Sequence, residues 1–172
     1  MRRIALALAS VVVVTALPAH AQVIGGDAGA CAVGNGPAIL ASVGGFKDRG
    51  GVLMLELYPA NAADFLAPDI KLIAAGKVFR RIRVGIPASG PVELCMRVPR
   101  PGRYALLAVH DRDGKTKFNF FSDGAGFPGN AKLGMSRPKV AAASIDVGPG
   151  VVSTAIRLQY LRGISGFGPL KN

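Results

Sequence analysis

Short apolar segments with turn residues between them recur along the chain from residue 37 onward. In residues 77–86 (KVFRRIRVGI) apolar and basic residues alternate, which is the period of two expected for a half-buried strand. Residues 52–58 (VLMLELY) form a nearly continuous apolar run that ends at a proline. The pattern predicts strands over residues 38–46, 52–58, 77–86, 92–98, 103–109, 140–147 and 151–161. Seven or eight strands with almost no helix indicate an all-β fold, an antiparallel β-sandwich of immunoglobulin-like or transthyretin-like type.

Two connections refine this prediction. Gly148-Pro149-Gly150 separates the last two apolar segments, and such a turn predicts that residues 140–147 and 151–161 pair as a hairpin. Residues 61–75 contain helix-forming Ala and Leu, but Pro68 interrupts them. We therefore expect at most a short helical turn there.

The N-terminal residues have the pattern of a signal peptide. Two arginines precede an apolar run over residues 4–17, and Ala19-His20-Ala21 offers small residues for cleavage before Gln22. About 14 apolar residues are short for a membrane span, although an uncleaved anchor is the alternative. We expect a periplasmic or secreted protein with no stable span after cleavage. The predicted organisation is a signal peptide (1–21), an irregular Gly/Ala-rich leader (22–36), the sandwich domain (37–162) and a C-terminal tail (163–172).

Cleavage would change the composition in ways that restrict function. The mature chain would keep 21 − 2 = 19 basic and all 10 acidic residues, a net charge near +9, and His110 as its single histidine. A site with several histidine ligands is then excluded within one chain. Export makes nucleic acid an unsuitable partner. The basic residues, clustered at Arg80, Arg81 and Arg83, suit an envelope component such as an anionic glycan or lipid, or they form solvated strand faces. No pattern indicates an oligomeric state.

The mature chain would contain two cysteines, Cys31 and Cys95. An even number in an oxidising compartment predicts a disulfide. Two free thiols or a redox pair are the alternatives, but the spacing is unlike C-x-x-C.

The segment from His110 to Asn130 is the best candidate for a binding site. It follows a strand and is rich in Gly, Asp and Phe. Its candidate contacts are polar side chains: His110, Asp111, Asp113, Asn119 and Asp123. Hard oxygen donors in a loop suit calcium, the one cofactor we consider, although the EF-hand pattern fails because Lys115 replaces an acid and no Glu closes the loop. The simpler alternative is that the aspartates bond to backbone N–H groups in turns.

Catalytic chemistry has less support in this segment. His110 and Asp111 are adjacent on a predicted strand, so they face opposite sides and form no dyad by spacing alone. An enzyme using His110 stays the third alternative, and we predict a protein that is not an enzyme. The four phenylalanines at 118, 120, 121 and 127 either cap the sandwich core or form an aromatic ligand platform.

The same segment resembles the DUF2141 family of small exported bacterial proteins. The resemblance rests on Gly102, Tyr104-Ala105, His110-Asp111 and residues 123–130 (DGAGFPGN), and it extends over residues 45–161. The family often carries Asp in place of Asn119 and Glu in place of Asp123. The resemblance implies a β-sandwich in the cell envelope and supplies no activity. We therefore predict a non-enzymatic binding or interaction module of the envelope, with a calcium-stabilised structural protein as the alternative.

Overall fold

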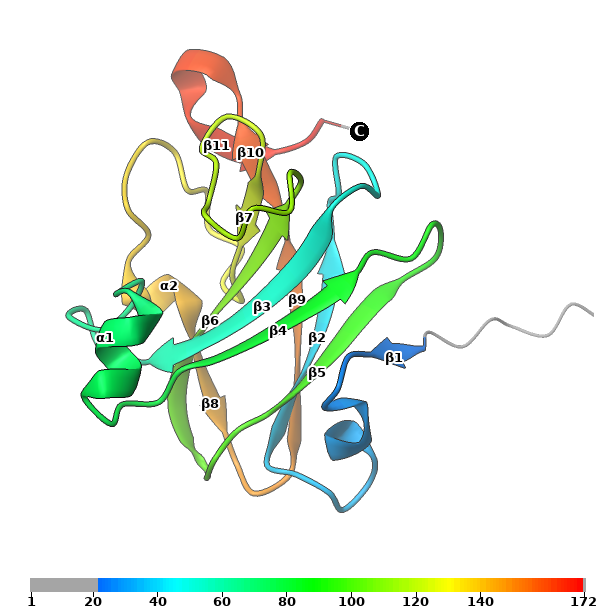
Figure 1. The fold of residues 1–172 in the computed structure, drawn as a ribbon, viewed down its shortest axis with the longest axis vertical. Coiled ribbons are helices and arrows are strands. Elements are labelled where there is room, and N and C mark those ends of the chain that lie inside the picture. The colour runs from blue at the N-terminus through cyan, green and yellow to red at the C-terminus, as the bar shows by residue number, and fades with distance from the viewer. Residues whose placement is uncertain (1–21, 172) are drawn as a thin grey trace, which may run out of the picture.

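Two β-sheets packed face to face form the protein in the computed structural model, which describes residues 22–171 (Figure 1). The predicted signal peptide, residues 1–21, lies outside the described residues. The described residues form eleven strands: β1 (Val23–Ile24), β2 (Ala38–Gly44), β3 (Val52–Pro59), β4 (Arg80–Gly85), β5 (Val92–Arg97), β6 (Gly102–Asp111), β7 (Gly124–Gly126), β8 (Ser144–Val147), β9 (Val151–Arg157), β10 (Gln159–Leu161) and β11 (Phe167–Pro169). The predicted all-β sandwich is confirmed. The strands beyond the predicted seven or eight are short ones.

Helical structure is limited to four short elements among the described residues. They are the α-helices α1 (Asp69–Ala74) and α2 (Val140–Ala143) and the 3-10 helices η1 (Ala28–Cys31) and η2 (Gly163–Ser165). Helix α1 follows Pro68, so the predicted short helical turn is confirmed. Within residues 22–171, none of these helices is long and apolar enough to cross a membrane.

The smaller sheet has the strand order β1-β5-β2-β9, and the larger has the order β11-β10-β7-β6-β3-β4, with β8 pairing with β6. Most neighbouring strands are antiparallel, whereas β1 pairs with β5 and β2 with β9 in parallel. The main core lies between the sheets. Leu53, Leu55 and Leu57 of β3 and Leu106 of β6 enter it, and all four are fully buried.

The outer face of the larger sheet is also covered, which explains why residues 52–58 are apolar throughout. Met54 and Tyr58 of β3 point away from the smaller sheet and pack with Phe65 and Phe127 in a second cluster. Helices α1 and α2 lie on the same side of the molecule, near the end of β3 (Figure 1). A strand buried on both faces does not alternate in polarity.

The predicted hairpin is wrong. Strand β8 pairs with β6 in the larger sheet, whereas β9 pairs in parallel with β2 in the smaller one. The first part of the predicted strand, residues 140–143, is helical. The turn at residues 148–150 therefore carries the chain from one sheet to the other. Turn residues predict a reversal of direction, but they do not specify the sheet that the next strand joins.

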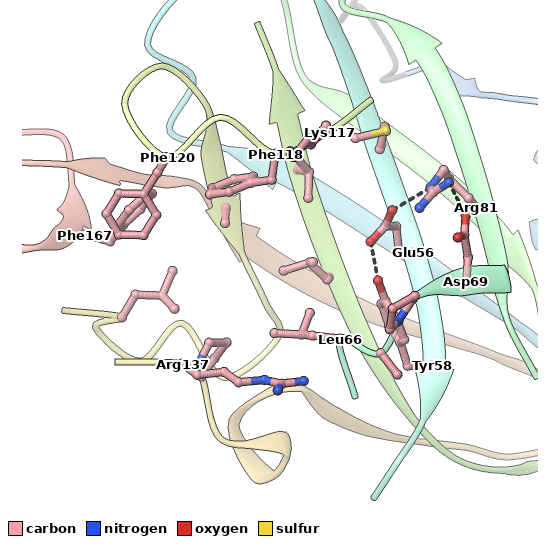
Figure 2. A pocket seen from close by; sticks show the side chains of 18 of the residues that line it. Glu56, Tyr58, Leu66, Asp69, Arg81, Lys117, Phe118, Phe120, Arg137 and Phe167 are labelled. Atoms are coloured by element: carbon pink, nitrogen blue, oxygen red, sulfur yellow. Dashed lines mark hydrogen bonds and ion pairs between the residues drawn. The ribbon is translucent and has the colours of Figure 1, made fainter. Parts of the chain in front are cut away.

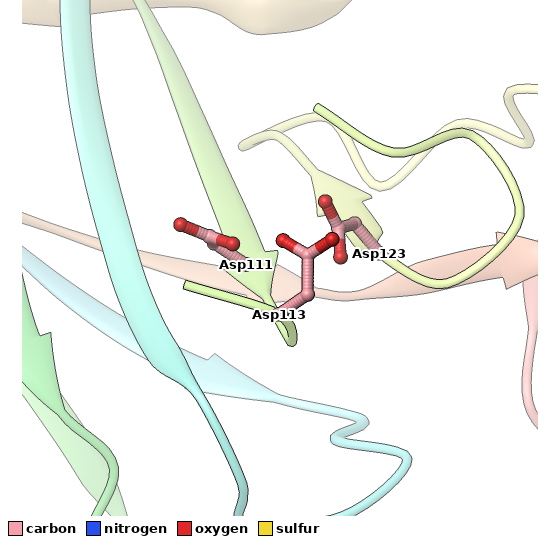
Figure 3. A group of neighbouring side chains, drawn as sticks. All are labelled: Asp111, Asp113 and Asp123. Carbon is pink, nitrogen blue, oxygen red and sulfur yellow. The ribbon is translucent and has the colours of Figure 1, made fainter. Parts of the chain in front are cut away.

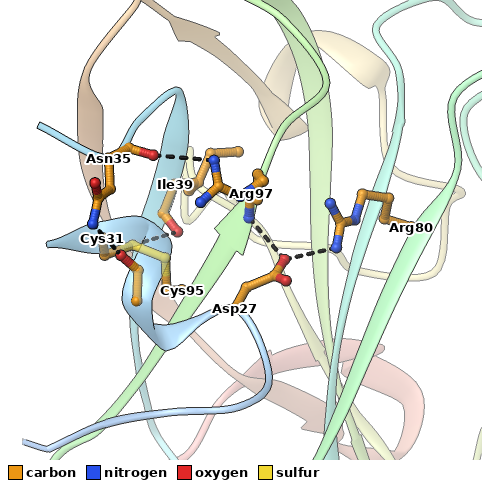
Figure 4. The surroundings of a disulfide bond; sticks show 8 residues. Asp27, Cys31, Asn35, Ile39, Arg80, Cys95 and Arg97 are labelled. Atoms are coloured by element: carbon orange, nitrogen blue, oxygen red, sulfur yellow. Dashed lines mark hydrogen bonds and ion pairs between the residues drawn. A yellow bond between two sulfur atoms is a disulfide. The ribbon is translucent and has the colours of Figure 1, made fainter.

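Elements of secondary structure also lie on both sides of the predicted domain, residues 37–162. Residues 22–36 include β1 and η1, and the disulfide between Cys31 and Cys95 attaches this segment to β5, as predicted (Figure 4). Asp27 adds an ion pair with Arg80 of 2.8 Å. At the other end, β11 pairs with β10 and buries Phe167, so this segment packs onto the larger sheet. Both segments are ordered because each pairs with the edge of an existing strand: β1 with β5, and β11 with β10.

Candidate ligand-binding groove and acidic loop

The loop between β6 and β7, residues 112–123, is held by carboxylates at its two ends. At the end of β6, Oδ2 of Asp111 accepts a hydrogen bond from the backbone N–H of Thr116 at 3.0 Å. Just before β7, Asp123 accepts backbone N–H groups of Arg112 at 3.0 Å and Asn119 at 2.8 Å. Both aspartates are 1% exposed. The loop is therefore folded around two buried carboxylates.

Asp113 forms the turn that the sequence offered as the simpler alternative. Its Oδ1 accepts the backbone N–H of Lys115 at 3.1 Å, and Gly114 between them has a positive φ of 71°. This hydrogen bond, followed by the attraction of the Lys115 side chain, lowers the pKa of Asp113 below its usual value. Asn119 likewise accepts the N–H of Phe121. Asp113 and Asn119 therefore shape the loop as well as lying in it.

Three carboxylates of this loop converge. Oxygen atoms of Asp111, Asp113 and Asp123 lie within 4.8 Å of one another (Figure 3). Positive charge nearby is limited: among residues 22–171, the ion pairs to these three carboxylates are Arg83 with Asp111 at 3.5 Å and Lys115 with Asp113 at 3.3 Å. Oδ1 of Asp111 is buried and accepts no hydrogen bond from any described residue. The cluster thus has unused acceptor capacity.

His110 lies on the opposite side of β6 and does not reach the surface. Its exposed fraction is 0%. Nε2 lies 2.7 Å from the carbonyl oxygen of Gly50 and Nδ1 lies 2.7 Å from the hydroxyl of Tyr160, which also accepts the backbone N–H of Lys47. We assign the proton to Nε2, since a carbonyl can only accept. Tyr160 then donates to Nδ1.

The groups around His110 indicate that this side chain has a structural role. Burial raises the pKa of Tyr160 to about 12, so its hydroxyl stays a donor. The ring of Tyr160 leaves no room for a side chain at residue 124, where a Cβ would lie 2.5 Å from the ring, so the position requires glycine. His110 has both nitrogens in use and is not among the residues that line the three main cavities of residues 22–171. It therefore orders the end of β6 and cannot contact a ligand as the structure stands.

A groove of about 700 Å³ lies on the outer face of the larger sheet (Figure 2). Its floor comes from β3, β6 and β7, and its walls are residues 66–69, residues 116–118 with Phe120, and residues 133–138. The acidic loop thus supplies one wall through Thr116, Lys117, Phe118 and Phe120. Most of the lining is apolar.

The phenylalanines divide between the two roles that the sequence left open. Phe127 is 1% exposed and packs in the outer cluster, so it contributes to the core. Phe118 and Phe120 line the groove beside Phe167, with ring centroids 6.0 and 4.8 Å from that ring. Phe121 is 84% exposed and is not part of the groove. Phe118 and Phe120 therefore form an aromatic surface together with Phe167 of β11.

The polar end of the groove was missed by the sequence reasoning. Oε1 of Glu56 accepts a hydrogen bond from Nε of Arg81 at 2.6 Å, and Oε2 accepts the hydroxyl of Tyr58 at 2.6 Å. Arg81 also pairs with Asp69 at 2.9 Å. Burial, and then the charge of Glu56, raise the pKa of Tyr58, which keeps the hydroxyl protonated. The signal in the sequence was a lone Glu in the apolar segment 52–58, but its partner is set by the pairing of Glu56 with Arg81 across β3 and β4.

The basic residues of β4 are not free to bind an anion. Arg81 and Arg83 face the outer side and pair with Glu56 and Asp111, and Arg80 pairs with Asp27. The cluster that the sequence offered for anionic partners is therefore largely neutralised within the chain.

Comparison with known proteins leads to a family and not to an activity. No curated protein and no solved structure matches this chain. Residues 41–155 match a family described as an uncharacterized protein conserved in bacteria, DUF2141. The matched region runs from β2 to β9 and includes the acidic loop and most of the groove. The chain therefore belongs to the DUF2141 family.

Proposed function

We propose that the protein is an exported binding module that holds an anionic amphipathic molecule of the fatty-acid or lipid type in the groove. The observation that carries this proposal is the groove itself, about 700 Å³ with a largely apolar lining. Ligand sites commonly have volumes of about 300–1,000 Å³, apolar walls and a few polar groups. One wall belongs to the segment between His110 and Asn130 that the sequence identified.

The lining favours an apolar ligand body over a sugar. Phe118, Phe120 and Phe167 present aromatic surface, and the polar groups at the other end already satisfy one another through Glu56 and its partners. A glycan would need donors and acceptors along its length, because unpaired polar groups in an apolar site lose their hydration. An acyl chain has no polar groups to dehydrate, and its binding is favoured because apolar surface is removed from water.

The charge at the rim favours an acidic head group. Lys117 and Arg137 are both part of the lining. Lys117 has no carboxylate within ion-pair distance among residues 22–171, and Arg137 is bound to a backbone carbonyl of Phe65 and not to an acid. Glu56, Asp69 and Arg81 together carry one net negative charge, so we expect the head group at Lys117, which lies beside Phe118 (Figure 2).

Two features support export. The N-terminal residues have the signal-peptide pattern, and the Cys31–Cys95 disulfide suits an oxidising compartment. A positively charged protein in the periplasm or outside the cell meets anionic lipids of the envelope, which would supply such a ligand.

The groove is tested by titrating the mature protein with decanoate and measuring heat. We expect one site, and Phe120→Ala should weaken binding about tenfold, since most of one aromatic contact is lost. Phe121→Ala is the matched control, because this neighbour lies outside the groove and contacts it only through the ring of Phe120, and it should lose much less affinity than Phe120→Ala. Equal losses in both variants, or no heat from decanoate or from phosphatidylglycerol vesicles, would contradict the proposal.

The head-group site is tested by charge. Lys117→Glu should weaken decanoate binding by about tenfold and leave the binding of uncharged decanol unchanged. Lys132→Glu makes the same charge change outside the groove and should have little effect on either ligand. An equal response of decanoate to the two substitutions would show that only the overall charge of the protein matters. Preferential binding of a soluble glycan over decanoate would also count against the lipid assignment.

A further inference from the structure

The three aspartates of the acidic loop carry more negative charge than their surroundings balance. Asp111 and Asp123 are 1% exposed, and the nearest cations are the side chains of Arg83 at 3.5 Å and Lys115 at 3.3 Å. Lys115 is 77% exposed and its amine is free to move into solvent. Burying several carboxylates together is unfavourable unless a cation or enough hydrogen-bond donors compensate.

A second observation, separate from the charge, is the unpartnered oxygen of Asp111. Oδ2 accepts the N–H of Thr116, whereas Oδ1 is buried and has no partner among residues 22–171. In Figure 3 one carboxylate oxygen of Asp111 faces Asp113 and Asp123. A buried charged oxygen without a partner is rare in native proteins and requires an explanation.

We propose that Asp111, Asp113 and Asp123 bind a calcium ion. Calcium prefers carboxylate oxygens at about 2.3–2.6 Å, so ligands on opposite sides of the ion are about 4.6–5.2 Å apart. The three oxygens lie within 4.8 Å of one another, which one ion can bridge. Magnesium usually keeps several waters and binds through one or two carboxylates, so three protein carboxylates suit calcium better. Each carboxylate oxygen has two lone pairs, so Oδ2 of Asp123, which accepts the N–H of Asn119, can still bind the ion, whereas Oδ1 already accepts from Arg112 and Ser122. Water completes the coordination.

The ion would connect the end of β6, the turn at Asp113 and the start of β7. Its effect would be to stabilise the loop 112–123, whose residues Lys117, Phe118 and Phe120 form a wall of the groove. The site does not depend on the groove having a ligand. Calcium binding is measured with the ion alone, so its outcome is independent of the decanoate experiments.

The experiment compares the melting temperature of the mature protein in EDTA and in CaCl₂, with the affinity measured by calorimetry. Calcium sites of extracellular modules have Kd values of about 10⁻⁴–10⁻³ M, so concentrations up to about 10 mM are needed. We expect the melting temperature to rise by about 5 °C, reversed by EDTA. No binding heat and no rise at 10 mM would overturn the proposal, and so would an equal response to magnesium.

Three substitutions locate the site. Asp113→Asn changes the exposed member of the cluster, should fold normally, and should weaken calcium binding at least tenfold. Asp111→Asn should abolish the calcium response, and if this buried variant does not fold, Asp113→Asn decides. Asp146→Asn removes one charge from an exposed aspartate of β8 outside the cluster and serves as the control. A calcium response that is the same in Asp113→Asn and Asp146→Asn would overturn the assignment.

Discussion

The two faces of the larger sheet are built from the same strands but have different partners. The inner face is closed by a second sheet, and the cluster buried there is formed by apolar residues and tyrosines, with His110 bound to Tyr160 at one end. The outer face is covered by two short helices and by loops, which leave a groove and bury charged groups such as Glu56, Asp111 and Asp123. A sheet on both sides would have left no room for a site. The closed inner face therefore provides most of the stability, whereas the partly covered outer face provides the candidate site.

His110 and Asp111 show this difference between adjacent residues. His110 faces inward, and each of its ring nitrogens has one partner. Asp111 faces outward and keeps one oxygen without a partner. The residue with the more familiar catalytic chemistry is therefore the structural one. Its neighbour, on the open face, retains capacity for a ligand.

The largest expected effect compares truncations on the two faces of β3. Leu55→Ala should reduce the free energy of unfolding by about 4 kcal/mol, because it leaves a closed cavity between the sheets. Met54→Ala, on the next residue, should cost about 2 kcal/mol, because Met54 lines the groove and its loss only widens an existing space. Urea unfolding measures both values. Equal costs would mean that the outer face is packed as completely as the inner face.

A smaller effect is expected when the stabilities of the His110→Ala and Asp111→Asn variants are compared in the presence of EDTA. His110→Ala should reduce the free energy of unfolding by about 3 kcal/mol, since the buried hydroxyl of Tyr160 loses its acceptor and a cavity forms. Asp111→Asn should stay within about 1 kcal/mol of the wild type, because it removes a buried charge that lacks full compensation. Chemical denaturation of the two variants checks this, and a larger cost for Asp111→Asn would reverse the assigned roles.

The smallest expected effect is a loss of stability in acid. The pKa values of Asp64, Asp69 and Asp113 are lowered, chiefly by hydrogen bonds from Lys77, from the backbone of Ile70 and from the backbone of Lys115. A lowered carboxyl pKa contributes stability that is complete above the unfolded value, about 3.9, and is lost as pH falls through the folded value.

These three groups lie on the outer layer, and Asp48, whose pKa is also lowered, is bound by Arg112 of loop 112–123, so acid should disturb this layer first. Amide signals from α1 and from loop 112–123 should shift below pH 4 in NMR spectra, while those of β2 and β3 stay unchanged. Simultaneous loss of all signals would indicate that the two layers unfold as one unit. The melting temperature should fall only below pH 4, since no lowered pKa lies above that range.

Much of the fold could be predicted from the sequence because the signals are local. Alternation over residues 77–86 placed β4, the apolar run at 52–58 placed β3, and Pro68 limited the helix that follows it. The even number of cysteines predicted the bond between Cys31 and Cys95. Each of these depends on near neighbours in the chain or on a simple count, so no knowledge of the tertiary structure was needed.

The candidate site was predicted only in part. The sequence identified Asp111, Asp113 and Asp123 as oxygen donors on one loop, and the structure brings these three carboxylates together. It also proposed His110 as a contact, and the structure buries this residue completely. Period-two reasoning shows that adjacent residues face opposite sides, but it does not say which side is closed by another sheet.

The amino-acid sequence by itself determined where most of the longer strands lie, which cysteines are available to pair, and which loop is rich in acid. The tertiary structure decided that β8 and β9 join different sheets, that Arg81 meets Glu56 across two strands, and that Phe167 completes an aromatic wall with residues almost fifty positions earlier. The physical reason is the distance along the chain over which each kind of interaction acts. Backbone preference and polarity act over a few residues, whereas burial and pairing depend on which distant segment covers each face.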